Sequence, residues 1–259
     1  MANNTVYQLF HPMISDENLV LDGAPLYVGL ECEIESIRAH RDGQHPFRVT
    51  TDGSLRNRGY EFVSKPIPLS DAVPQFNKLH STILLHDPEK AFSDRTSIHV
   101  HVNCANLPEL EVRNIIYMYA LFEELFFLLV EPTRRHNIHC VPLTETYLPA
   151  YYKGDLNMLV SKWHKYTALN IKPLPGQGTI EFRHMHGHND PVLLETWLGT
   201  INALFECGRM NPINKATLTD TNIKSWFREI FGNTRMSIMQ DIVPSMCFNS
   251  ITDLKLAVM

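Results

Sequence analysis

Acidic, imidazole and guanidinium side chains recur at alternating positions in three short segments of the chain. The segments are residues 28–35 (VGLECEIE), 97–103 (SIHVHVN) and 178–183 (GTIEFR). Because successive side chains of a β-strand point to opposite faces, each segment would present its polar residues on one face. The predicted polar faces hold Glu31, Glu33 and Glu35, then His99, His101 and Asn103, and finally Thr179, Glu181 and Arg183. Carboxylates, imidazoles and a guanidinium on one sheet face are the groups that a metal-dependent phosphoryl-transfer site requires.

The pair Glu31 and Glu33 is the most acidic part of this pattern. Side chains two residues apart on a strand are roughly 7 Å apart. At that distance two buried charges repel by about 2 kcal/mol when the effective dielectric constant is about 20. A divalent cation would turn the repulsion into coordination, and oxygen ligands favour magnesium or manganese over zinc. The alternative interpretation is a solvent-facing acidic edge, on which the charges are hydrated.

The two later segments have structural alternatives as well. An HxH pair on a strand, here His99 and His101, presents both rings to one face, but many such pairs are only structural. Glu181 and Arg183 place an acid and a base on one face, which also suits a cross-strand salt bridge.

Two adjacent arginines, Arg134 and Arg135, follow the helix stop at Pro132. Such pairs are usually solvated, but a loop after a buried helix can also direct them at a phosphate. The chain contains no GxxxxGK[ST], glycine-rich dinucleotide, HExxH or GxSxG motif. If a nucleotide binds, metal ions and arginines must therefore hold its phosphates in place of a glycine-rich cradle.

The composition predicts one substantial domain. The chain has 259 residues, of which 44% are hydrophobic, and a formal net charge of −5. This length supports a single core, and the negative charge argues against nucleic acid as a partner. Five cysteines without a CxxC pair argue against a disulfide framework or a zinc ribbon and indicate a reducing, cytosolic compartment.

Neither a signal peptide nor a membrane span is predicted. The first ten residues, MANNTVYQLF, lack a basic segment followed by a long apolar run. The most apolar stretch, residues 115–130, contains Glu123 and Glu124 and is shorter than the ~20 apolar residues that a spanning helix needs. We interpret it as a buried helix and expect a cytoplasmic location, without a membrane partner.

The order of predicted elements indicates an α+β fold, since strands joined by hairpins and long loops precede a helical C-terminus. Besides the three segments above, strands are predicted at 5–10, 60–64 and 166–171, turns at 22–25 and 51–54, and a loop at 173–176. Helices are predicted at 70–86, 106–130, 155–165 and 190–207, with two or three more from residue 221 onward.

Taken in order, these blocks resemble the amidoligase family, the carboxylate–amine ligases related to glutamine synthetase. The resemblance covers about residues 26–190 and leaves 191–259 as a helical C-terminal part of a single domain spanning 1–259. The matching blocks are the GxExE of 29–33, residues 51–54 with 59–64, residues 99–102, residues 134–140 and residues 179–183, with Asn170 upstream of the last. The resemblance implies a glutamine-synthetase-like fold, in which a curved, mainly antiparallel sheet lines a site for ATP and metal.

The resemblance also implies roles for individual residues. The implied ligands for Mg²⁺ or Mn²⁺ are Glu31, Glu33, His99 and Glu181. Glu61 would be a further acidic ligand or an amine contact, and Asp52 or Glu61 would help to deprotonate the incoming ammonium. His101 would contact the nucleotide or the substrate, and Asn170 and Arg183 would contact the nucleotide. Arg183 with Arg134 or Arg135 would stabilise the transferring phosphate.

The activity implied is ATP-dependent formation of an amide bond through an acyl phosphate. The substrates would be a small-molecule or peptide carboxylate and an amine, and bacterial and phage members are expected, so that a phage-encoded protein would act in the host cytoplasm. The oligomeric state stays open. Two alternatives remain, a zinc-dependent amide hydrolase and a non-catalytic binding or assembly protein. The histidine-rich segment 184–188 suggests either a second metal site or structural residues, since alternation turns His184 and His186 away from Glu181.

Overall fold

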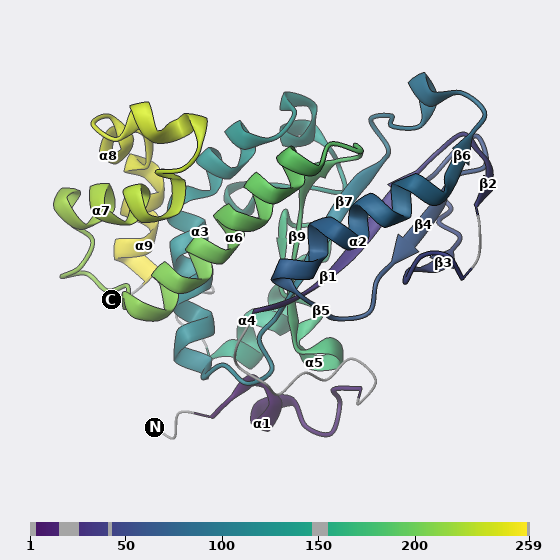
Figure 1. Ribbon diagram of the computed structural model, residues 1–259. Helices are drawn as coiled ribbons and strands as arrows, with labels where there is room; N and C mark the ends of the chain where they lie inside the picture. Colours follow the sequence, from purple (N-terminus) through teal and green to yellow (C-terminus); the bar gives the residue numbers. More distant parts are fainter. Residues whose placement is uncertain (1–3, 16–25, 41–42, 147–154, 258–259) are drawn as a thin grey trace.

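The computed structural model describes residues 4–15, 26–40, 43–146 and 155–257 and has the predicted α+β class. An open antiparallel sheet is covered by helices on one side, and the C-terminal helices lie at the end of the molecule opposite β3 and β4 (Figure 1). The strands are β1 (Tyr27–Ile34), β2 (Ile37–His40), β3 (Arg48–Thr50), β4 (Tyr60–Val63), β5 (Ile67–Pro68), β6 (Ile83–Leu85), β7 (Ser97–Asn103), β8 (Leu169–Asn170) and β9 (Thr179–His186).

Helices of very different lengths connect and follow these strands. The α-helices are α1 (Val6–Phe10), α2 (Leu69–Thr82), α3 (Glu109–Leu129), α4 (Leu156–Lys162), α5 (Leu174–Gln177), α6 (Pro191–Met210), α7 (Asp220–Phe231), α8 (Val243–Met246) and α9 (Phe248–Ala257). Short 3-10 turns are η2 (Pro88–Lys90), η3 (Pro132–His136), η4 (Leu143–Glu145) and η6 (Arg235–Met239). Among the described helices, none is long and apolar enough to cross a membrane.

The main sheet has the strand order β3-β4-β1-β7-β9-β8, with β5 also paired to β1. All of these pairs are antiparallel, and β2 and β6 form a separate two-stranded sheet. The three polar segments of the sequence therefore become neighbouring central strands, β1, β7 and β9. Their order brings side chains that are far apart in the sequence onto one continuous face.

The apolar face of the sheet packs against the long helices. Phe182 of β9 has ring contacts with Tyr119 and Phe126 of α3 and with Trp197 of α6, at centroid distances of 6.1, 6.3 and 6.4 Å. Leu30 of β1 is fully buried on the same face. Because neighbouring residues of a strand point to opposite faces, this packing turns the polar residues of β1, β7 and β9 away from the helices.

A β-bulge interrupts the pairing of β7 with β9 beside His99. Val100 pairs with Phe182, but Ile98 pairs with Met185, so that β9 has one extra residue at Arg183 and His184. A bulge bends a strand and redirects its side chains. Here it places Met185 opposite Ile98 and returns His186, opposite Ser97, to the polar face.

Several local predictions are corrected by the structure. Residues 5–10, predicted as a strand, form helix α1, because Thr5 and Gln8 make a capping box in which each side chain accepts the other's backbone N–H. The predicted loop 173–176 contains the short helix α5, and the predicted strand 166–171 shrinks to β8. The predicted turn at 22–25 lies outside the described residues.

The remaining helix predictions are confirmed with shifted ends, except that residues 83–85 of the predicted helix 70–86 form strand β6. Asp190 caps α6 by accepting hydrogen bonds from the backbone N–H groups of Val192 and Leu193, and Pro191 occupies the first helical position. The helix predicted from residue 106 begins at Glu109, after Pro108. The C-terminal segment is helical, as predicted.

Candidate functional site

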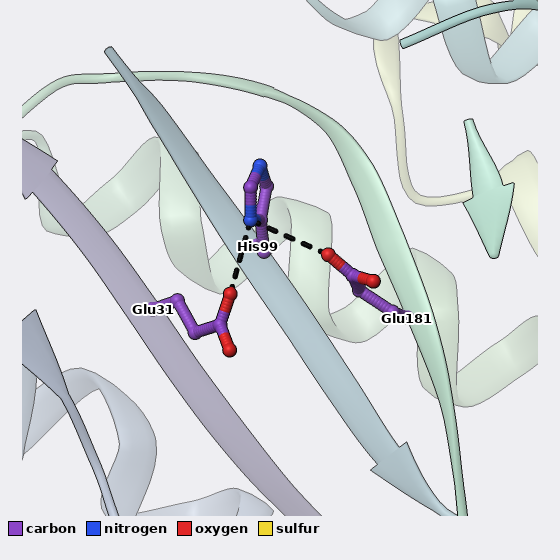
Figure 2. Close-up of side chains that lie close together, drawn as sticks. All are labelled: Glu31, His99 and Glu181. Carbon is purple, nitrogen blue, oxygen red and sulfur yellow. Dashed lines mark hydrogen bonds and ion pairs between the residues drawn. The ribbon is translucent and has the colours of Figure 1, made fainter. Parts of the chain in front are cut away.

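Three predicted site residues meet on the polar face, one each from β1, β7 and β9 (Figure 2). The pairing sets Glu31 opposite His99, whose Nδ1 lies 3.1 Å from Glu31 Oε2 and 3.4 Å from Glu181 Oε1. His101 reaches the other oxygen of Glu31, with Nε2 3.2 Å from Oε1. Two carboxylates and two imidazoles therefore form one chain of contacts, which runs from Glu181 through His99 and Glu31 to His101.

Hydrogen bonds determine which nitrogen of His99 carries the hydrogen. Ser97 Oγ donates to Glu33 Oε2 over 2.6 Å, and the Ser97 backbone N–H donates to the same oxygen over 2.7 Å. The hydroxyl has one hydrogen to give, so it accepts from His99 Nε2, 2.8 Å away. In the neutral ring Nδ1 then carries a lone pair that a cation could take, and in the protonated ring Nδ1 donates to Glu31 Oε2, 3.1 Å away. A cation among these three ligand atoms would replace repulsion with coordination.

Two groups of side chains on this face have the spacing that a metal ion needs. Glu31, His99 and Glu181 form one group, and Glu33, Glu61 and His99 form the other, with ligand atoms within 4.8 Å of one another in each. Each group offers two carboxylates and one imidazole. This oxygen-rich donor set suits Mg²⁺ or Mn²⁺ better than zinc, so the residues present fit the metal that the family resemblance implies.

The electrostatics of the site show how crowded the carboxylates are. Burial raises the pKa of Glu31, but hydrogen bonds with His101 and His99 outweigh it and hold the pKa well below its usual range. Burial lowers the pKa of His101, yet contact with Glu31 outweighs it, so the net shift is upward. Burial, followed by the charge of Glu31, raises the pKa of Glu61 to about 7. A bound divalent cation would let these carboxylates ionise together.

Glu181 is held in place from both sides. Asn170 of β8 donates from Nδ2 to Glu181 Oε2 over 2.7 Å, and Arg183 Nη1 pairs with Oε1. Arg183 Nε also donates to the carbonyl of His139 over 2.9 Å. Among the described residues, Arg183 Nη2 has no hydrogen-bond partner. The guanidinium is therefore fixed in position while part of it remains available to a ligand.

The structure separates the two adjacent arginines. Arg134 is buried, and it donates from Nε to the carbonyl of His184 over 3.0 Å and from Nη2 to the carbonyl of Arg183 over 2.6 Å. Arg135 instead forms partly exposed ion pairs with Glu124 and Glu145. Arg134 thus supports the β9 bulge under the site, and Arg135 is not brought to the site.

Two further acids of the sequence pattern have different surroundings. Glu35 lies past the end of β1 and accepts a hydrogen bond from the backbone N–H of Arg56, so it anchors the loop between β3 and β4. Asp52 accepts from the backbone N–H of Ser54 in the predicted turn. Its charge also contributes to the raised pKa of Glu61.

Sequence reasoning assigned no role to two residues that position the site, Ser97 and Thr179, although it placed Thr179 on the polar face. Ser97 links Glu33 to His99, and Thr179 Oγ1 lies 3.0 Å from His101 Nδ1. Ser97 and Thr179 are the first residues of their strands, and each lies two residues before a residue of the polar face. This spacing is the signal that could have identified them. The backbone contact from His139 to Arg183 has no comparable signal.

Beneath the site, a buried hydrogen-bonded chain joins α3 to β9. Tyr119 Oη donates to Glu123 Oε1 and lies 2.8 Å from His184 Nε2. Glu123 also accepts the backbone N–H groups of Leu143 and Thr144. Burial raises the pKa of Glu123 to about 7 and lowers the pKa of His184 to about 3. The hydrogen-bonded chain of Tyr119, Glu123 and His184 supports the core side of β9, the strand that carries Glu181 and Arg183.

We expect Glu123 to make the stability of the protein depend on pH. Its pKa rises from 4.5 to about 7 on folding, so the fold favours the neutral acid and loses stability as pH increases from 4.5 through 7. The full loss is about 3 kcal/mol. Glu123→Gln stays neutral at every pH. Its stability relative to the wild type, measured by urea denaturation, should therefore increase by about 3 kcal/mol as the pH is raised from 5 to 8. A difference that is constant with pH would contradict this.

The histidine-rich segment after Arg183 divides between two environments. Alternation correctly predicts that His184 faces away from Glu181, since it is fully buried in the core. For His186 the prediction is wrong, because the bulge pairs it with Ser97 and so returns it to the polar face. Its ring contacts that of His188 at 5.4 Å. Within the described residues, these histidines join no group of three ligand atoms close enough to hold a metal ion.

A cleft of about 780 Å³ opens over the polar face from Glu31 toward the β3 edge. Its acidic end contains Glu31, Glu61 and His101. Its other lining residues are Tyr27, Val28, Gly29, Leu30, Pro46, Arg48, Thr50, Val63, Ser64, Lys65, Pro66, Asn103, Gln177 and Thr179. A ligand in this cleft would touch Glu31 at one end and basic side chains at the other.

The fold and site together define an α+β protein with an acidic, histidine-containing centre of metal-binding type on an open sheet face. A family model described as "putative amidoligase enzyme" matches residues 15–203, and the chain belongs to this family. The match spans β1, β7 and β9 and most of α6. Among curated proteins, no sequence matches the chain.

Proposed function

We propose that the protein is an ATP- and Mg²⁺-dependent carboxylate–amine ligase that forms an amide bond through an acyl phosphate. The observation that carries this proposal is the pair of acidic ligand groups sharing His99, next to the fixed guanidinium of Arg183, in a chain of the amidoligase family. We further propose that the antiparallel sheet, with its polar face open, is related to that of glutamine synthetase.

The proposed metal ligands are Glu31, Glu33, Glu61, His99 and Glu181. When bound, Mg²⁺ would neutralise charge on the phosphates of ATP. Ser97 fixes the tautomer of His99, and Asn170 orients Glu181, so the ligand atoms are held before any ligand arrives. Such preorganisation lowers the cost of assembling a charged transition state.

The chain's residues would assist two successive steps. In the first, a substrate carboxylate oxygen attacks the γ-phosphorus of ATP, ADP leaves, and Arg183 stabilises charge on the transferred phosphoryl group. In the second, an amine attacks the acyl carbon and inorganic phosphate leaves. The proton released from the ammonium passes to a carboxylate of this face, for which Glu61 and Asp52 are the candidates. His101 would contact the nucleotide beside Glu31.

The donor set favours the ligase over the zinc hydrolase alternative. Each ligand group contains two carboxylates and one imidazole, and the sheet is antiparallel, in contrast to the strand–helix repeats of barrel amidohydrolases. A non-catalytic role would leave no reason to hold these carboxylates so close together.

The test is release of ADP from ATP and Mg²⁺ with panels of carboxylic acids and amines. We expect turnover that needs both partners, and an ¹⁸O-labelled carboxylate should transfer one ¹⁸O atom to the phosphate released. Amide hydrolysis without ATP, accompanied by bound zinc, would contradict the proposal. Glu195→Gln, an exposed change on α6 beyond the opposite face, is the matched control for variants of the acidic residues.

A further inference from the structure

The cleft beside the metal-type centre has basic side chains at the end far from His99. Arg48 of β3 pairs with Val63 of β4, and Val63 pairs with Glu31 of β1, so these three residues form one row across the polar face. Two strand spacings separate Arg48 from Glu31, which is about 10 Å. Lys65 follows Val63 by two residues and lines the same cleft.

Arg48 and Lys65 are both exposed, and neither side chain makes a hydrogen bond or an ion pair to any other described residue. Glu61 is a diagonal neighbour of Arg48 on the adjacent strand, roughly 7–8 Å away between Cα atoms, yet the two side chains do not pair. The cation and the carboxylate instead face the same space. That space suits a ligand with a positive group at one end and a negative group at the other.

Gly29 lines the floor of the cleft and has no side chain that could fill it. It pairs with His101 on the polar face, and a Cβ atom built at Gly29 would lie 3.5 Å from His101 Cβ, an ordinary contact. Neither the backbone nor the neighbours therefore require glycine here. Any larger side chain would project into the cleft between Glu31 and Tyr27.

We propose that this cleft binds the amine substrate of the ligase and that this substrate carries its own carboxylate, as an amino acid or a short peptide does. Its ammonium end lies toward Glu61 and Glu31, and its carboxylate is bound by Arg48 and Lys65. This inference rests on the proposed function, because it places the amine beside the centre at which the acyl phosphate would form. Charge-assisted hydrogen bonds from arginine and lysine are well suited to a carboxylate.

The test measures binding of the common amino acids, and of the same molecules as C-terminal amides, by saturation-transfer NMR with Mg²⁺ present. At least one amino acid should bind the wild type, and its amide should bind at least tenfold more weakly. The double variant Arg48→Gln/Lys65→Gln should also lose roughly tenfold or more in affinity. Arg38→Gln/Lys78→Gln removes two exposed charges elsewhere, on β2 and α2, and should bind like the wild type.

A steric series at Gly29 tests the same cleft independently. Gly29→Ala should bind the amino acid nearly as well as the wild type, whereas Gly29→Leu should lose most of the binding at an unchanged melting temperature. The subsite is overturned if no amino acid binds, if acid and amide bind equally, or if both Gly29 variants bind normally.

Binding of a non-hydrolysable ATP analogue to the same proteins separates this inference from the proposed function. If the double variant at Arg48 and Lys65 loses the analogue but keeps the amino acid, the basic end binds phosphate and the subsite is overturned. If the wild type binds the amino acid but never the analogue, the subsite stands and the ligase is overturned.

Discussion

Replacing Glu31 with glutamine is expected to weaken divalent-cation binding at the group of Glu31, His99 and Glu181 and to lower ligase turnover on the order of a thousandfold. Glu31 contacts both His99 and His101 and belongs to one of the two ligand groups. The amide keeps the size of the side chain but offers a neutral oxygen and a hydrogen-bond donor in place of two charged acceptors. Metal affinity should fall roughly a hundredfold or more, measured by calorimetry with Mn²⁺ and Mg²⁺.

The melting temperature gives a second readout of the Glu31 prediction. A ligand that binds only the folded state raises the melting temperature, so the wild type and Glu195→Gln should gain stability with Mn²⁺, while Glu31→Gln should gain less. An equal gain in all three proteins would mean that the cation binds elsewhere and that Glu31 is not a ligand.

Replacing Arg134 with methionine is expected to cause the largest loss of stability among single changes near the site, about 3 kcal/mol or more. The guanidinium is buried and donates hydrogen bonds to the carbonyl groups of Arg183 and His184 at the β9 bulge. Leaving a buried acceptor unsatisfied costs about 1–3 kcal/mol for each group. Urea denaturation measures the loss, and turnover should fall too, because Arg183 would no longer be fixed.

The adjacent arginine is the matched control for this prediction. Arg135 pairs with Glu124 and Glu145 near solvent, and exposed ion pairs contribute at most about 1 kcal/mol. Arg135→Met should therefore change stability little and leave turnover near the wild-type value. If Arg134→Met were as stable as Arg135→Met, the buried contacts would not support the bulge as we describe.

The site face could be read from the sequence because alternation is a local property. The polar phase of 28–35, 97–103 and 178–183 predicts which residues share a face without any knowledge of strand order. It could not predict that β1, β7 and β9 are neighbours, since pairing depends on contacts between distant segments. Neither the GxExE block nor the HxH block indicates a shared site by itself. The blocks do so only together, in their order along the chain.

The failures of the sequence reading have specific physical causes. A bulge adds one residue to β9, and from that point the alternation is out of phase, which is why His186 was assigned to the wrong face. Two adjacent arginines have the same local sequence, so only tertiary packing separates the buried Arg134 from the exposed Arg135. The capping box of Thr5 and Gln8 overrides the strand-like run that follows it.

The basic end of the cleft could not be predicted from the sequence either. Arg48 and Lys65 are isolated cations in the sequence, with nothing to distinguish them from other surface residues. They become notable only because the pairing of β3 with β4 and of β4 with β1 aligns them with Glu31.

The most direct test of the ligase proposal is isothermal calorimetry of a non-hydrolysable ATP analogue, with and without Mg²⁺, on the wild type and on Glu31→Ala/Glu33→Ala. Binding that requires Mg²⁺ and is lost in the double variant is the predicted result. The absence of binding under every condition would contradict the account and would favour the hydrolase or the non-catalytic role.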